Sequence, residues 1–244
     1  MDIKEMTENL YEAFKSYRIN GQIDKCPCGC IPDEEERKIY SKPLNELTID
    51  DLGFYLGKAM STWGEVNHFK HFLPRLFELY SQDRYNGYID LNSIVNKLEY
   101  GKWIEWRDYE KNSIIDYTTA DWIDLVNFKS SQLSISTFED YSKFIDFAIL
   151  IELWDFKKGG LAFRNFVGMI EYEGYTIFNS RKPILIKNKD CTSVFQDLLL
   201  DNEVVTLLEN EFFEFETSDY DYAGKISLAL QMIENELKIR KNDW

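Results

Sequence analysis

The stretch "AGKISLALQMIENEL", residues 223–237, decides the fold class. Its apolar residues recur every three or four positions, which is the spacing of one helix face: Ala223, Ile226, Leu230, Ile233 and Leu237. Asp219 or Asp221 can cap this helix, because a short acidic side chain accepts hydrogen bonds from the first backbone N–H groups. The stretch therefore predicts an amphipathic helix that packs one face against the rest of the protein.

The same period recurs through most of the chain. Residues 7–19 are expected to form a helix that begins near Thr7. The apolar stripe of "VNHFKHFLPRLFELY", residues 66–80, also has helical spacing. Pro74 has no backbone N–H to donate, so we expect it to kink or restart that helix. Only 12 Gly and 5 Pro are present, and this scarcity of turn residues disfavours a many-stranded β architecture.

Polar residues mark three expected helix starts. Thr48 is followed three positions later by Asp51, which resembles a capping box with the shorter Asp in place of Glu or Gln. Thr137 is expected to cap a segment that is apolar on nearly every face and therefore lies centrally. Ser193 with Gln196 predicts a further capping box.

One segment departs from the helical pattern. In "GYTIFNSRKPILIKNKD", residues 174–190, β-branched residues and Pro183 indicate an extended excursion, for which a small hairpin is one form. No Gly/Ser/Pro-rich linker divides the sequence. We therefore expect an all-α fold of packed helical pairs, of which a HEAT-like stack is one form. We expect it to make a single domain over residues 1–244, with one short β excursion near 174–190.

Composition and charge limit the classes of partner. The formal net charge of −15 repels phosphate backbones, so nucleic-acid binding is not expected. The first twenty residues contain no apolar signal segment, and no uncharged apolar run is long enough to span a bilayer. We expect a cytoplasmic protein without a membrane partner. The acidity either keeps the protein soluble or provides a docking face for a basic protein.

The stretch "KCPCGCIPDEEE", residues 25–36, carries the main candidate site. Cys26, Cys28 and Cys30 lie in a Cys-rich turn, residues 21–33, and cytoplasmic thiols stay reduced. Structural zinc needs four ligands, usually supplied in part by C-x₂-C pairs, whereas these gaps are single residues. His68 or His71, which form H-x-x-H, can supply a fourth ligand. Two interpretations stay open: a compact turn with small buried thiols and no cofactor, or a zinc site.

Other catalytic patterns are weak. The sequence contains neither G-x-S-x-G nor the phosphate-binding frame G-x-x-x-x-G-K. Cys191 precedes an expected helix, whose N-terminus would lower the pKa of its thiol, but no histidine is near it in sequence. The charge run at residues 33–38 places acids first and bases last, which suits the dipole of a short helix. The sequence therefore identifies no catalytic residue.

The succession of "CPCGC", "KPLNELTIDDL" and "TWGEVNHFKHFLPRLFEL" resembles a family of uncharacterised bacterial proteins. The resemblance is specific between about residues 26 and 80 and implies no activity. The family pattern corresponds here to Cys26, Cys28, Trp63, Gly64, His71, Pro74 and Arg75. Family members place the next cysteine differently from Cys30, and a Cys-x-Cys with a histidine in one pattern favours zinc.

These observations favour a protein-binding module over an enzyme. One specific form is an immunity-like protein that neutralises a basic toxin domain. The alternatives are a metal-dependent enzyme with a Cys/His site, in which an open coordination position activates water, and a purely structural zinc-stabilised protein.

Overall fold

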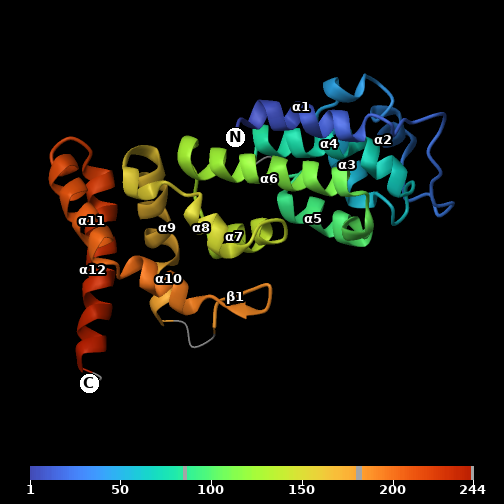
Figure 1. The fold of residues 1–244 in the computed structure, drawn as a ribbon. Coiled ribbons are helices and arrows are strands. Elements are labelled where there is room, and N and C mark those ends of the chain that lie inside the picture. The colour runs from blue at the N-terminus through green and yellow to red at the C-terminus, as the bar shows by residue number, and fades with distance from the viewer. Residues whose placement is uncertain (85–86, 180–182, 243–244) are drawn as a thin grey trace. The chain divides into compact units, whose positions relative to one another are not determined.

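A computed structural model describes residues 1–84, 87–179 and 183–242 and shows an all-α fold (Figure 1). The all-α prediction is confirmed, and so is the presence of one short β excursion. The chain forms two compact units, Met1–Asp121 and Trp122–Trp244. The single domain over 1–244 and the HEAT-like form of stack stay predictions.

The first unit is built from helices and short 3₁₀ turns. These elements are α1 (Ile3–Phe14), α2 (Asp33–Lys38), η1 (Leu44–Glu46), α3 (Ile49–Lys58), α4 (Val66–Gln82), α5 (Leu91–Tyr100), η2 (Trp103–Glu105) and α6 (Asp108–Phe128). Helix α4 packs against α1 and α5, and α3 packs against α2 and α5 (Figure 1). Helix α6 continues past Asp121 into the second unit.

Helix α4 forms the centre of the first unit. The predicted stripe is buried at four positions, with Val66 half-buried: Phe69, Leu73, Leu76 and Tyr80. Pro74 lies inside α4, so the helix does not restart there, and the alternative of a kink stays a prediction. Proline costs an interior helix about 3 kcal/mol. The surrounding burial of apolar side chains offsets this cost and keeps α4 continuous.

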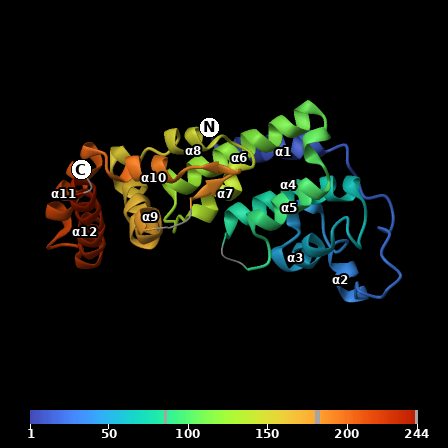
Figure 2. The ribbon, with the colours of Figure 1, turned by 90° about the horizontal axis from the view of Figure 1, so that it is seen from below.

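The second unit contains the remaining helices and the only strands among the described residues. Its elements are α7 (Ile135–Ser142), α8 (Phe147–Glu152), η3 (Phe156–Lys158), α9 (Gly160–Asn179), β1 (Leu185–Ile186), β2 (Lys189–Asp190), α10 (Thr192–Leu199), α11 (Asn202–Phe215) and α12 (Tyr220–Asn242). Helix α12 packs against both α9 and α11 (Figure 2). Within its predicted stripe, Ala223, Ile226 and Ile233 are buried, and Asp219 caps the helix by accepting from Tyr222 N at 3.2 Å.

Helix starts were predicted with mixed success. The capping box of Thr48 and Asp51 is confirmed. The cap predicted at Thr137 is wrong, because Ser134 caps α7 and accepts a hydrogen bond from the Thr137 N–H. Both residues can cap a helix, and the sequence placed the start one turn too late.

Two further helix starts also differ from expectation. Helix α1 begins at Ile3, capped by Asp2, and ends at Phe14, whereas the sequence predicted residues 7–19. The box of Ser193 with Gln196 is wrong, because the N-cap position of α10 is Cys191 and the Thr192 N–H donates to Asp190 Oδ1 at 2.9 Å. The Gln196 amide instead donates to the Ile177 carbonyl of α9 at 2.9 Å, a contact that local sequence does not reveal.

The β excursion is shorter than expected. Residues 174–179 belong to α9, and residues 180–182 lie outside the described part of the chain. Strands β1 and β2 pair antiparallel through a two-residue turn at Lys187 and Asn188. Both turn residues have positive φ, the conformation of the tight turns that favour hairpins.

Candidate metal centre

The backbone of the Cys-rich turn is held by the connection between α3 and α4. The Cys26 N–H donates to the Thr62 carbonyl at 2.8 Å, and the Gly64 N–H donates to the Asp24 carbonyl at 2.8 Å. The residues between these pairs form an isolated antiparallel β-bridge. The first cysteine is therefore fixed by a segment almost forty residues later in the sequence.

The three cysteines lie together. All three Sγ atoms of Cys26, Cys28 and Cys30 are within 4.8 Å of one another. Gly29 has φ +74°, a conformation that glycine adopts without strain, and this allows the chain to turn tightly between the cysteines. Cys28 is exposed and the other two are half-buried. Because thiolates are soft metal ligands, this group can hold a metal ion.

The thiols also influence one another's protonation. Hydrogen bonds from the side chains of Cys26 and Cys30 to Cys28 lower the pKa of Cys28 to about 7. The pKa of Cys30 is raised, chiefly because it donates to Cys28. The Cys28 N–H also donates to Cys26 Sγ at 3.4 Å. The lowered pKa of the exposed Cys28 favours its thiolate form.

Lys25 joins the Cys-rich turn to α2. Its Nζ lies 2.5 Å from Glu36 Oε2 and 3.1 Å from Asp33 Oδ1. Glu36 also accepts from the Gln22 amide at 2.6 Å. The hydrogen bond from Lys25, followed by that from Gln22, holds the pKa of Glu36 below its usual value. The acidic run after the cysteines thus forms the first turn of α2 and positions Lys25.

The structure does not bring the histidines into the cysteine group. His68 Nδ1 accepts from the Glu65 backbone N–H at 3.0 Å and caps α4. His71 Nδ1 lies 2.8 Å from the Tyr17 carbonyl, and burial lowers the pKa of this histidine. Among the residues that the structure describes, the group of ligand atoms within 4.8 Å of one another contains the three cysteines and no histidine or carboxylate.

Trp63 and Gly64 lie behind the Cys-rich turn. The Trp63 ring is buried and meets Tyr55 edge-on, with 5.3 Å between ring centroids. Gly64 has φ +73°, and a Cβ on it would lie 2.7 Å from Ile23 Cγ2. Both residues therefore have structural roles, and they position the segment that carries the cysteines.

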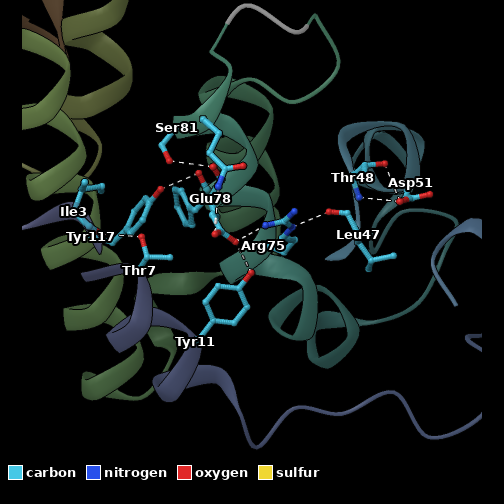
Figure 3. Close-up of polar contacts among 12 residues, drawn as sticks. Ile3, Thr7, Tyr11, Leu47, Thr48, Asp51, Arg75, Glu78, Ser81 and Tyr117 are labelled. Carbon is cyan, nitrogen blue, oxygen red and sulfur yellow. Dashed lines mark hydrogen bonds and ion pairs between the residues drawn. The ribbon is translucent and has the colours of Figure 1, made fainter. Parts of the chain in front are cut away.

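Pro74 and Arg75 lie on α4 and are also engaged within the first unit. Arg75 Nε donates to the Leu47 carbonyl at 2.7 Å, and Arg75 Nη1 lies 2.6 Å from Glu78 Oε2 (Figure 3). Tyr11 of α1 donates to the same carboxylate oxygen at 2.7 Å. Arg75 thus links α1, α4 and the segment before α3. Cys26 and Cys28 differ from these residues of the pattern, because the hydrogen bonds of their thiols lie within the Cys-rich turn.

Sequence reasoning missed a buried ion pair. Lys70 Nζ lies 2.8 Å from Glu110 Oε2, and both side chains are buried. The same ammonium group lies 4.1 Å from the centroid of the Trp106 ring, and Tyr17 donates to Glu110. The partners are forty residues apart, so no local pattern could reveal the pair.

Cys191 lies in surroundings that make a thiol unreactive. It is buried, and burial raises the pKa of its thiol. Its Sγ lies 3.6 Å from the Lys189 carbonyl. The lowered pKa that its place before α10 suggested is therefore wrong, because desolvation outweighs the helix N-terminus.

Comparisons with protein-family models, curated proteins and solved structures gave no match to this chain. The resemblance to the uncharacterised bacterial family stays a prediction. Within the described ranges, none of the helices combines the length and apolar character that crossing a bilayer requires. The case for function therefore depends on the side chains of this chain alone.

Proposed function

We propose that this protein is a protein-binding module that docks a basic partner through an acidic surface on α11 and the start of α12. Glu209, Glu214, Glu216 and Asp221, together with Phe213 and Tyr220, define this docking surface. The sequence from Glu203 to Asp221 contains seven acidic residues and no lysine or arginine. Such a surface attracts cationic partners and accelerates their association.

The acids of the docking surface are not neutralised within the described chain. Neighbouring acids do have partners: Glu203 pairs with Lys157, Asp219 pairs with Arg164, and Glu211 accepts from a tyrosine hydroxyl. The four acids of the docking surface are exposed, and none has an ion-pair partner among the residues described. Their charge is therefore available to a partner.

Aromatic exposure at the same place is the observation that carries the proposal. Phe213 is 70% exposed and Tyr220 is 84% exposed, although apolar α11 residues such as Val204 and Leu208 are fully buried. Exposed aromatic side chains are typical anchors of protein interfaces, where their burial contributes much of the binding energy. An exposed phenylalanine among unpaired carboxylates fits a partner with both basic and apolar side chains.

Photocrosslinking in the native host tests this proposal. A variant with p-benzoylphenylalanine in place of Phe213 is compared with a variant that carries it in place of Tyr100, which is 63% exposed on α5 of the first unit. We expect position 213 to give a discrete adduct with a basic protein and position 100 to give none. Equal labelling from both positions, or an acidic partner, would contradict the proposal.

An immunity-like protein is the specific version of this proposal. Its partner would be a basic toxin domain, and the net charge of −15 supports this choice of partner. The crosslinked protein would then inhibit growth when it is produced alone, and co-production of this chain would relieve the inhibition. A crosslinked partner without toxicity would leave protein binding in place and remove the immunity version.

The Cys-rich turn supports a second candidate function, the binding of zinc. The grouping of three sulfur atoms within 4.8 Å favours it. A site closed by four protein ligands would be structural, whereas an open position would permit a metal-dependent enzyme to activate water. Metal analysis of reduced, purified protein tests this candidate, because stoichiometric zinc is expected and its absence would remove both versions.

A further inference from the structure

We infer that Cys26, Cys28 and Cys30 together hold one Zn²⁺ through three thiolates and leave its fourth position to a neutral donor from outside the chain. This inference rests on the second candidate of the proposed function and is independent of the docking surface. It departs from the sequence prediction, in which His68 or His71 completed the site.

The spacing of the sulfur atoms suits a shared ion. A Zn–S bond is about 2.3 Å long, so two sulfurs on one zinc lie at most about 4.6 Å apart, and about 3.8 Å apart in a tetrahedral site. The three sulfurs here are already within 4.8 Å of one another. Closing the site therefore needs shifts of a few tenths of an ångström to about one ångström in a turn with an exposed central cysteine.

The other candidate donors of the described chain lie outside the group of sulfur atoms, so the ligand count stops at three. His68 Nδ1 accepts from the Glu65 N–H, and His71 Nδ1 is used by the Tyr17 carbonyl. Two of the acids that follow the cysteines, Asp33 and Glu36, both pair with Lys25. No histidine or carboxylate of the described chain joins the sulfurs in the ligand group.

Zinc in proteins is almost always four-coordinate, so three thiolates leave one position for a donor from solvent or from another molecule. Cys28 is exposed, which gives that donor access. Binding releases the thiol protons to solvent, because the thiolate is the ligand.

The acidic residues around the cysteines influence which ion and which fourth ligand the site favours. The segment from Asp24 to Glu36 carries five acids and one base, Lys25. Three thiolates with Zn²⁺ carry one negative charge, whereas three thiolates with Cu⁺ carry two. Because like charges repel, the acidic surroundings favour zinc over cuprous ion and a neutral fourth donor, such as water or an imidazole, over an anion.

Cobalt substitution tests the inference on the full chain, reduced and stripped of metal. We expect one Co²⁺ per chain with thiolate-to-cobalt charge-transfer absorption, and we expect one Zn²⁺ to displace it. Added imidazole is expected to shift the visible d–d bands, because it enters the open position. No cobalt uptake, or bands that do not respond to imidazole, would overturn the inference.

Variants identify the ligands. Cys28→Ser is expected to weaken cobalt binding at least about tenfold, since even changes next to metal ligands cost about 10–100-fold. Cys191→Ser is the matched control and should bind cobalt as the wild type does. His68→Gln and His71→Gln should keep the spectrum, with circular dichroism as the check on folding. Loss of the spectrum in a folded histidine variant would overturn the three-thiolate site.

The test of the metal site can fail or succeed independently of the test of the docking surface. Crosslinking at position 213 involves the second unit and no cysteine of the Cys-rich turn. A protein that binds zinc and captures no partner would refute the docking surface alone, and the reverse result would refute the metal site alone.

Discussion

The Cys-rich turn and the docking surface on α11 use their polar residues in opposite ways. In the turn, Lys25, Glu36 and the backbone of Asp24 and Cys26 all find partners within the first unit. On α11 and at its C-cap, Glu209, Glu214 and Glu216 lie exposed without ion pairs among the described residues. The comparison teaches that charge alone does not mark a site. What marks one is a group of chemically able side chains that lie together and reach the surface: three thiols, with Cys28 exposed, in the first region, and exposed acids and aromatics in the second.

The largest loss of stability is expected for Lys70→Met, which tests the buried ion pair of the first unit. Removing the ammonium group leaves the buried Glu110 carboxylate without its ionic partner. Breaking a buried pair in this way costs about 3–5 kcal/mol, so urea denaturation should show a loss of this size. Lys4→Met, at an exposed position of α1, is the control and should change stability little. A Lys70→Met variant as stable as wild type would show that the pair does not hold the first unit together.

Gly64→Ala tests the support behind the Cys-rich turn. The substitution forces a positive φ on a residue with a Cβ and brings that Cβ to 2.7 Å from Ile23. A loss of about 1–3 kcal/mol in the free energy of unfolding is expected from the backbone strain. Gly57→Ala is the matched control, because that helical glycine faces open space. The control should be neutral or gain about 0.5–1 kcal/mol, and equal losses in both variants would contradict this explanation.

Acid titration tests the contact between Lys25 and Glu36. Because the pKa of Glu36 is lower in the folded protein than its ordinary value of 4.5, the pair stabilises the fold above that value. The contribution is lost as the pH falls through the lowered folded pKa. Glu36→Gln should therefore be less stable than wild type at pH 6, and the difference should shrink by pH 3. Glu34→Gln, at an exposed position, should show no such pH dependence. A constant Glu36→Gln difference would contradict the pairing.

The smallest effect on stability is expected on the docking surface. Glu214→Lys with Glu216→Lys should change the free energy of unfolding by no more than about 0.5 kcal/mol, because both side chains are exposed. The same double variant should lose the partner captured from position 213. Glu5→Lys with Glu8→Lys reverses as much charge on α1 and should keep the partner. Retained capture in the α11 variant would show that its acids do not contribute to binding.

Much of the fold could be predicted because its helices repeat their apolar residues locally. The α12 stripe and the capping box of Thr48 with Asp51 both depend on residues within a few turns. The extension of α9 through residues 174–179 could not be predicted from β-branched residues. There α9 packs on α12 so closely that a Cβ on Gly174 would lie 2.8 Å from Met232 Sδ, and this packing overrides local propensity.

In the candidate site, too, local sequence predicts one part and misses another. Cys26, Cys28 and Cys30 are close in sequence, so their grouping in space follows from a local turn. The partner of His71 is the Tyr17 carbonyl, fifty-four residues away, and no spacing rule predicts it. The sequence therefore identified residue types that suit a metal, and the fold groups the three cysteines and leaves the histidines outside that group.

The central claim is that chemically able side chains that lie together and reach the surface mark the sites of this protein, and the thiols are its most specific case. X-ray absorption at the zinc edge, on full-length protein loaded with one Zn²⁺, tests it most directly. The account predicts three sulfur ligands and one nitrogen or oxygen ligand. That nitrogen or oxygen ligand should be unchanged in His68→Gln and His71→Gln. A zinc ion with fewer than three sulfur ligands, or one that loses its nitrogen or oxygen ligand in a folded histidine variant, would contradict it.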